Sequence, residues 1–260
     1  MIEVQNLSKS VEGHTILSDL TFQVESGENL ALLGANGSGK SLLLRILATL
    51  TKPTNGTVKI AGQDAFANLR AVRPLIGYVP ETFEGYPHLS IVEYLDFFAA
   101  AYKLDKSGRA TAIDDVLNLM DIAALAHRKI ASLSRGEKWR LCLAKTFLHE
   151  PEIWLFDEPL SGLDVRGRIE LNTLIGELAA MDKTIVTATN RPEDVAPICS
   201  QVIILAEGGV VFSDNIKNIQ MNLEDMFLQV TTPDTSEEED DEGNAPVNIS
   251  EADSGQKMAD

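Results

Sequence analysis

The chain contains 260 residues, of which 44% are hydrophobic, and it carries a formal net charge of −17 at pH 7. This length is enough for one sizeable core, and no apolar run approaches the roughly 18 residues that a membrane-spanning helix needs. The acidic balance argues against a nucleic-acid partner, and the N-terminus lacks the basic start and apolar core of a signal peptide, so we expect a soluble, intracellular protein.

Short apolar or β-branched runs alternate with stretches of helical periodicity, which predicts an α/β fold. We expect strands near residues 2–4, 16–24, 30–33, 57–60, 76–79, 153–156, 184–187, 202–205 and 210–212. We expect helices at residues 40–48, 91–102, 110–120, 137–149, 166–180 and 193–198. The stretch from about residue 83 to 133 is mostly helical without a good strand, which indicates an α-helical subdomain inserted into the α/β core.

The last 29 residues differ in composition from the rest of the chain. From Thr232 onward there are ten acidic residues, one basic residue and no aromatic residue. Such a segment cannot bury enough apolar surface to fold alone, so residues 232–260 are predicted to be an acidic disordered tail. Solvated disorder is favoured over a binding element, and the folded domain is predicted to span residues 1–231.

A glycine-rich loop, GANGSGKS, joins the apolar run at 30–33 to the helical pattern that follows it. A strand, a glycine loop and a helix in this order predict a phosphate site, because backbone N–H groups converge on an anion at the helix N-terminus. The glycines are expected to allow positive φ and close approach of a ligand. Lys40 suits the β and γ phosphates and the Ser41 hydroxyl suits Mg²⁺, whereas a simple connecting turn is disfavoured by the flanking pattern. The candidate residues are Gly34, Ala35, Asn36, Gly37, Ser38, Gly39, Lys40 and Ser41.

Two acidic residues follow the apolar strand in the sequence EIWLFDEP. An acid at the C-terminal edge of a strand beside a phosphate loop can hold Mg²⁺ or its waters, which is the role expected of Asp157. Glu158 is then placed to polarise a water in line with the γ phosphate. A strand that ends in acids is common by itself, so the catalytic interpretation depends on the glycine loop.

A second motif, LSRGE at residues 133–137, precedes these acids by about twenty residues. Ser134 and Glu137 predict a capping box, so a well-capped helix is the simpler interpretation. Gly136, however, costs stability in a first helical turn, and a helix N-terminus with a serine hydroxyl and a glycine is also an anion site.

The motif LSRGE resembles the signature motif of the ATP-binding-cassette family, and it stands between a Walker A loop at 34–41 and a Walker B strand at 153–157. SGLD, which ends at Asp164, resembles the D-loop, and the resemblance runs from about residue 2 to residue 212. It implies a P-loop NTPase α/β core with an antiparallel β subdomain and an inserted helical subdomain. It also implies an ATP-sandwich dimer in which the signature of one protomer meets the ATP held by Lys40 of the other. The signature residues are Ser134, Arg135, Gly136 and Glu137.

Three positions depart from the pattern of that family. Glu81 replaces the usual glutamine but keeps an oxygen for Mg²⁺ or water, and Val11 stands where an aromatic ring commonly stacks on adenine. Asn190 stands where the switch histidine is expected, and it cannot carry a proton near neutral pH, so we expect near-normal ATP binding and slow hydrolysis. Asn190 is also explained as the N-cap of a helix with Pro192 and Glu193 in its first turn.

A lone cassette with a short helical subdomain resembles the ATP-binding subunit of a transporter. The resemblance implies ATP and Mg²⁺ as cofactors, a dimer with a second copy or another cassette, and a separate transmembrane permease. The chain would then lie at the cytoplasmic face of the cell membrane through that partner. Glu81 favours export, since glutamate occurs there in cassettes resembling exporter subunits. The alternative is a regulatory or ribosome-linked ATPase that transports nothing.

Overall fold

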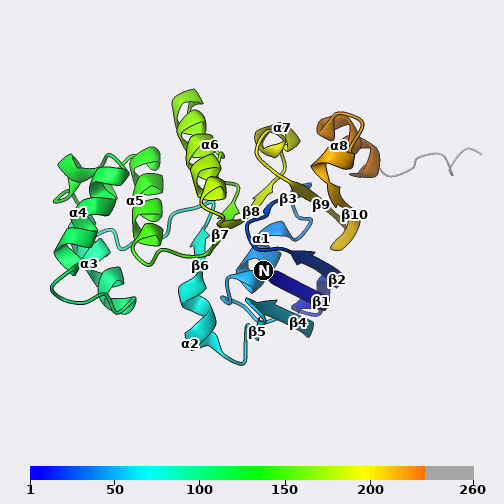
Figure 1. The fold of residues 1–260 in the computed structure, drawn as a ribbon, viewed down its shortest axis with the longest axis horizontal. Coiled ribbons are helices and arrows are strands. Elements are labelled where there is room, and N and C mark those ends of the chain that lie inside the picture. Colours follow the sequence, from blue (N-terminus) through cyan, green and yellow to red (C-terminus); the bar gives the residue numbers. More distant parts are fainter. Residues whose placement is uncertain (232–260) are drawn as a thin grey trace, which may run out of the picture.

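A six-stranded sheet forms the centre of the computed structural model, which describes residues 1–231 (Figure 1). Five of its strands are parallel, and β10 pairs antiparallel with β9 at one edge. The strand order is β10 (Gly209–Asn215), β9 (Gln201–Ala206), β3 (Asn29–Gly34), β8 (Thr184–Thr189), β7 (Ile153–Asp157) and β6 (Ile76–Val79). Every residue of β3, β7 and β8 is buried, which explains why these strands consist mainly of apolar and β-branched residues.

A second, antiparallel sheet has the strand order β2–β1–β4–β5. Its strands are β1 (Ile2–Val11), β2 (His14–Val24), β4 (Asn55–Ile60) and β5 (Gln63–Asp64). Strand β1 is longer than the predicted 2–4, because the prediction followed the short apolar run at its start. Beyond Val4 the strand contains polar residues and register shifts, which a search for apolar runs does not detect. One core cluster contains residues of both sheets and of α1 (Lys40–Leu47). The antiparallel subdomain is therefore packed directly against the helix that follows the glycine loop.

The helical subdomain gathers at one end of the molecule, away from the antiparallel sheet (Figure 1). Its helices are α3 (Ile91–Ala101), α4 (Arg109–Leu119) and α5 (Arg135–Phe147). No strand lies between residues 83 and 133, where only an isolated bridge pairs Ser90 with Lys129, so the helical prediction is confirmed. A second core cluster joins these helices to the large aromatic side chains of β7 and to α6 (Val165–Ala180).

Several short elements were not predicted from the sequence. They are α2 (Leu69–Val72), four 3₁₀ turns (Arg73–Leu75, Ala123–Leu125, Ile130–Ser132 and Ile216–Asn218) and the longer α8 (Leu223–Thr231). Helix α8 inserts Leu223 and Phe227 into a third core cluster beneath β3 and β9. Helix α7 (Pro192–Val195) is shorter than the predicted 193–198, and the predicted tail lies outside the described residues.

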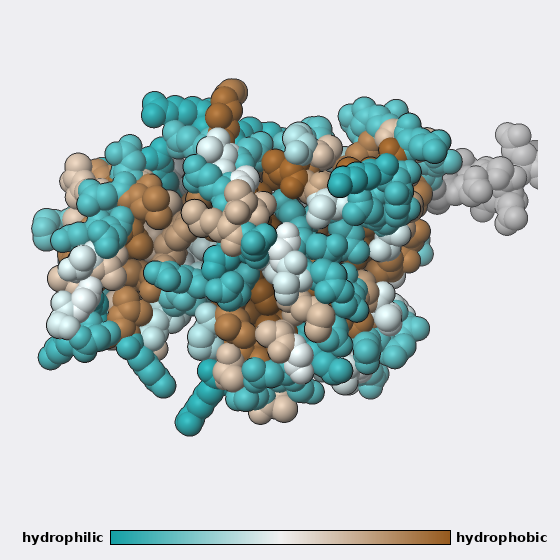
Figure 2. Space-filling view, in the orientation of Figure 1, coloured by the Kyte–Doolittle hydropathy of each residue, from teal (hydrophilic) through white to brown (hydrophobic). Residues whose placement is uncertain are grey.

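The outer surface of the described part is mixed rather than uniformly polar. Figure 2 shows hydrophobic side chains in small groups between hydrophilic ones on the face that it presents. Among the helices of residues 1–231, none combines the length and the apolar character that a membrane crossing requires.

Candidate functional site

The glycine loop runs from the end of β3 to the start of α1, as predicted. Gly37 and Gly39 adopt φ values of 85° and 98°, in the left-handed region that glycine occupies without strain. Gly34 is not in that region, so the expectation of positive φ is wrong for this residue. Glycine is required there by space instead, because a Cβ would lie 2.6 Å from the Leu205 carbonyl oxygen and still closer to Ser38 Oγ.

Lys40 is 5% exposed, and its ammonium group faces the glycine loop and the carboxylate of Glu158. Nζ donates to the carbonyl oxygens of Gly34 at 2.7 Å and Ala35 at 3.1 Å, and it lies 3.8 Å from Glu158 Oε1. Burial lowers the pKa of Lys40, and the neighbouring carboxylates of Glu158 and Asp157 oppose that shift. The Lys40 amino group is therefore held at the loop by two carbonyl oxygens and one carboxylate.

The geometry of the glycine loop is suited to a polyphosphate group. Ser38 Oγ is buried and has no hydrogen-bond partner within residues 1–231. A Cβ at Gly39 would collide with the Leu17 side chain, so the backbone can run this close to the antiparallel sheet only with glycine. The ammonium group of Lys40 and the N-terminus of α1 thus lie together at the glycine loop, as an anion site requires.

Asp157 lies at the end of β7 with both carboxylate oxygens in hydrogen bonds. Ser41 Oγ donates to Oδ1 at 2.8 Å, and the Tyr78 hydroxyl donates to Oδ2 at 3.1 Å. Burial raises the pKa of Asp157, and these two hydrogen bonds oppose the shift. Ser41 and Asp157 were predicted separately from two motifs. The structure places their oxygen atoms together, as a pair of ligands suited to Mg²⁺.

Glu158 has φ of 45°, a left-handed conformation that is uncommon for a residue with a side chain. Its backbone N–H donates to the Ala188 carbonyl oxygen at 2.9 Å, and its Oε2 accepts from Thr189 Oγ1 at 3.0 Å. Burial is the main cause that raises the pKa of Glu158, while Thr189 and Lys40 oppose it. Strain of this kind persists where surrounding contacts fix the residue, and it is frequent at functional sites.

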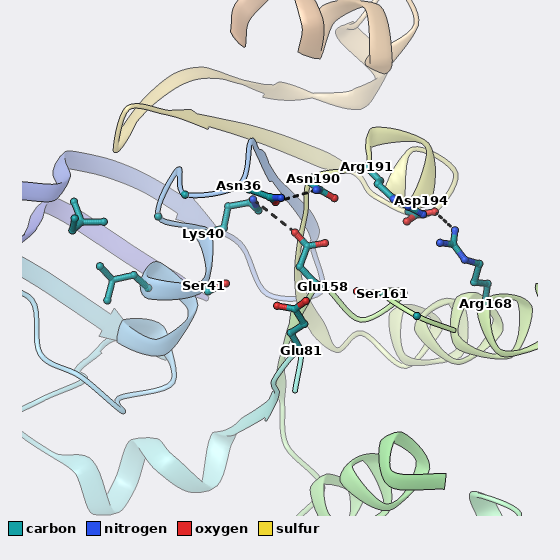
Figure 3. Close-up of a pocket in the computed structure, with 15 residues that line it drawn as sticks. Asn36, Lys40, Ser41, Glu81, Glu158, Ser161, Arg168, Asn190, Arg191 and Asp194 are labelled. Atoms are coloured by element: carbon teal, nitrogen blue, oxygen red, sulfur yellow. Dashed lines mark hydrogen bonds and ion pairs between the residues drawn. The ribbon is translucent and has the colours of Figure 1, made fainter. Parts of the chain in front are cut away.

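Asn190 does not cap the following helix, so that interpretation is wrong. The N-cap of α7 is Arg191, without a side-chain hydrogen bond, and Pro192 is at the first helical position. Asn190 Nδ2 instead donates to Asn36 Oδ1 at 3.0 Å, which brings the end of β8 to the glycine loop (Figure 3).

These groups surround a cavity of about 600 Å³ that is shown in Figure 3. Apart from Ser161 and Gly162 of the D-loop motif, five of its residues were not predicted from the sequence: Ile16, Leu42, Arg168, Arg191 and Asp194. Arg168 and Asp194 form an ion pair of 2.8 Å between α6 and α7. The exposed Val11 is not part of the lining, whereas Ile16 on the neighbouring strand is. The lining comprises Ile16, Asn36, Gly37, Gly39, Lys40, Ser41, Leu42, Glu81, Glu158, Ser161, Gly162, Arg168, Asn190, Arg191 and Asp194.

The signature residues face a separate cavity of about 580 Å³, together with Asp164 of the D-loop. Ser134 accepts from the Glu137 N–H at 3.3 Å, and the Glu137 carboxylate accepts from the Ser134 N–H at 2.7 Å, so the predicted capping box is confirmed. Asp164 caps α6 by accepting from the Gly167 N–H at 2.8 Å. Arg135 is exposed and lies against Gly162, where a Cβ would collide with its guanidinium group. The chain therefore does not bring its own signature to its own Lys40.

Comparison with known proteins agrees with these motifs. A family model described as ABC transporter matches residues 17–161. The uncharacterized ABC transporter ATP-binding protein YxlF of Bacillus subtilis is 32% identical over 220 residues, or 85% of this chain and 72% of that protein. The Nod factor export ATP-binding protein I of Burkholderia pseudomallei is 30% identical and covers 80% of this chain and 68% of its own length. The sulfate/thiosulfate import ATP-binding protein CysA of Shigella flexneri is 32% identical and covers 82% of this chain and 60% of its own length.

Solved structures share the whole cassette arrangement. An ATP-binding subunit of an ABC transporter superposes with a TM-score of 0.82 at 27% identity, covering 89% of this chain and 100% of that chain. A dimeric ATP-binding cassette solved in a post-hydrolysis state with ADP and Pi superposes with a TM-score of 0.76 at 25% identity, covering 83% of this chain and 99% of that one. The chain therefore belongs to the ABC transporter family, as an ATP-binding subunit with ATPase activity.

Proposed function

We propose that this subunit hydrolyses ATP with Mg²⁺ in a head-to-tail dimer and drives export through a separate membrane subunit. The observation that carries the proposal is the separation of two half-sites within one chain. Lys40, Ser41 and Glu158 line one cavity, whereas Ser134 and Gly136 line another. A second cassette, either another copy or a related chain, would bring its signature to the γ phosphate. The dimeric cassette solved with ADP and Pi supports this arrangement.

The residues of the site divide the chemistry between them. Lys40 would donate to the β and γ phosphates, and Ser41 with Asp157 would hold Mg²⁺, which supplies positive charge beside the transferring phosphoryl group when bound. Glu158 would accept the proton of the attacking water, a role that its raised pKa supports. Glu81 lines the same cavity and would contact Mg²⁺ or the water with its carboxylate. Val11, outside the cavity lining, would contact the adenine from the rim without stacking on it.

Hydrolysis is proposed to be slow because of Asn190. Its amide lies at the glycine loop and can donate a hydrogen bond to a γ phosphate, but it carries no charge and transfers no proton. Loss of such a group costs about 10²-fold in rate for general acid–base assistance or transition-state charge stabilisation. A dimer of two such chains would hold ATP for long periods, and pairing with a histidine-bearing cassette would restore faster turnover.

The direction of transport, export, is the most specific part of the proposal, and Glu81 is its main support. The Nod factor export protein favours the same direction, but the relative named for sulfate import has similar identity, so relatives alone do not decide it. The membrane partner would place the chain at the cytoplasmic face of the cell membrane. The domain division is also part of the proposal: residues 1–231 would form the ATP-binding domain, with the helical subdomain at about 83–133 inside it, and residues 232–260 would be an acidic tail outside it.

The decisive experiment uses inside-out membrane vesicles with and without the membrane protein encoded by a neighbouring gene. We expect this chain to bind the vesicles only when that protein is present, and ATP to drive uptake of candidate substrates into them. Such uptake corresponds to export from the cell. Binding that is independent of the membrane protein would contradict the transporter partnership, and uptake only in right-side-out vesicles would reverse the direction.

A further inference from the structure

Tyr78 contacts the metal-binding pair from a strand that carries none of the family motifs. Its hydroxyl lies 3.1 Å from Asp157 Oδ2, while Ser41 Oγ lies 2.8 Å from Oδ1 of the same carboxylate. A phenolic hydroxyl keeps its proton at neutral pH and an ionised carboxylate can only accept, so Tyr78 is the donor. Each oxygen of Asp157 therefore has its own donor within the described residues.

The sheet determines this contact. Strands β6 and β7 are parallel neighbours, and Tyr78 is paired with Leu155. Leu155 and Asp157 are two residues apart, so they project from the same face of the sheet as Tyr78. A long aromatic side chain reaches such a diagonal neighbour, and the Tyr78 ring is packed against the first core cluster. The hydroxyl is consequently held in place by the fold.

We propose that Tyr78 is a positioning residue that sets the Mg²⁺ affinity of the ATP site by orienting the Asp157 carboxylate. Asp157 is 4% exposed, so water cannot replace the lost donor freely. With Oδ2 fixed by Tyr78, Oδ1 is directed at the Ser41 hydroxyl, where the two oxygens are spaced for one cation. Hydrogen bonds to a ligating carboxylate commonly change metal affinity or activity about 10- to 100-fold when they are removed. This inference rests on the proposed Mg²⁺ role of Ser41 and Asp157.

The competing interpretation is that Tyr78 only fills the core. Tyr78→Phe separates the two, because phenylalanine keeps the ring and removes the donor. Tyr94→Phe is the control, since it deletes the hydroxyl of a buried tyrosine on α3, without touching Asp157. A purely structural role would lower the melting temperature of Tyr78→Phe without changing its Mg²⁺ dependence.

The test measures ATP binding by calorimetry in the full chain, first with EDTA and then across a Mg²⁺ titration. For Tyr78→Phe we expect unchanged ATP affinity in EDTA and an increase of about tenfold in the Mg²⁺ concentration that gives half-maximal enhancement. The Tyr94→Phe control should match the wild type. Each variant's ATP affinity with Mg²⁺ is compared with its own affinity in EDTA, so a smaller folded fraction affects both measurements equally and does not change their ratio. A Mg²⁺ requirement within twofold of the wild type would overturn the inference.

Asp157→Ala distinguishes failure of this inference from failure of the proposed metal site. If Asp157→Ala abolishes the Mg²⁺ enhancement and Tyr78→Phe leaves it unchanged, Tyr78 does not position the carboxylate and the metal site stands. If Asp157→Ala keeps the full enhancement, the metal assignment itself is wrong. Binding of Mn²⁺ in the presence of ATP, followed by its electron paramagnetic resonance signal, provides a second readout that does not depend on hydrolysis.

Discussion

Asn190 Nδ2 donates a hydrogen bond of 3.0 Å to Asn36 Oδ1, although the two residues are 154 positions apart in the sequence. The bond joins the end of β8 to the glycine loop on the rim of the ATP cavity (Figure 3). In the proposed function, a side chain at this point would lie near the terminal phosphate of a nucleotide held by the loop. The residue type at 190 is therefore expected to affect the reaction, and it does not cap α7.

Replacing Asn190 by histidine should accelerate hydrolysis. An imidazole at this position can carry positive charge and a proton, and we expect single-turnover hydrolysis to rise by roughly 10- to 100-fold at constant ATP affinity. The measurement is rapid-quench hydrolysis of radiolabelled ATP in purified protein with its partner. Asn190→Ala is the control, because it removes the amide without adding a titratable group. Brisk wild-type turnover without any gain from histidine would contradict the prediction.

Lys40→Ala should abolish ATP binding or weaken it severely. Lys40 is the only lysine or arginine in the glycine loop, and a triphosphate in that loop would lose its main compensating cation. Titration calorimetry with Mg²⁺ and ATP gives the affinity. Lys52→Ala, a change at an exposed lysine beyond α1, should bind ATP as the wild type does. Undiminished affinity in Lys40→Ala would show that the loop is not the nucleotide site.

Much of the fold could be predicted because buried parallel strands leave a strong signal. Strand β8 is apolar or β-branched throughout, and the predicted range of 184–187 ends only two residues before the strand does. Helix α8 was missed although Leu223, Met226 and Phe227 have helical spacing, because the segment is short and lies beside the acidic tail. Strand β1 was cut short because the prediction followed the apolar run at its start, whereas the strand continues through polar residues and register shifts.

The motif residues of the site were predictable, but most contacts between them were not. The sequence placed Ser41 and Asp157 in one function, and the fold brings them within 2.8 Å of each other. Tyr78 had a usable signal, since it lies in an apolar strand that ends near Glu81, but its partner follows only from the pairing of β6 with β7. The Asn190 contact depends on the position of a loop that no local pattern encodes.

Removing residues 233–260 should leave folding and ATP binding nearly unchanged. Helix α8 closes the described part through Leu223 and Phe227, and the removed segment has no aromatic residue with which to pack. We expect the melting temperature to change by less than about 2 °C, which corresponds to less than about 0.5–1 kcal/mol. A chain that ends at Asn222, which also loses α8, is the contrasting variant and should melt far lower. A fall of several degrees on removal of the tail alone would show that the tail packs.

Glu158→Gln should separate ATP binding from ATP hydrolysis. Glutamine has the same shape and keeps an oxygen to accept from Thr189 Oγ1, so the strained backbone and the cavity should be preserved. It cannot accept the proton of an attacking water, so steady-state hydrolysis should fall at least about 100-fold. ATP affinity should change little, because the contact between Lys40 Nζ and Glu158 Oε1 is long, at 3.8 Å, and Lys40 has two carbonyl partners besides.

The stalled variant should also accumulate as an ATP-bound dimer, since ATP that is not hydrolysed keeps the two half-sites together. Size-exclusion chromatography with Mg²⁺ and ATP should show the dimer for Glu158→Gln and not for Glu158→Gln combined with Lys40→Ala. Glu177→Gln makes the same chemical change on an exposed turn of α6 and should hydrolyse ATP at the wild-type rate. Unchanged hydrolysis in Glu158→Gln would remove Glu158 from the role of base. A loss of ATP affinity in that variant would instead assign its charge to nucleotide binding. The proton acceptor would then have to be sought at Glu81, because Asp194, the remaining carboxylate of the cavity lining, is paired with Arg168.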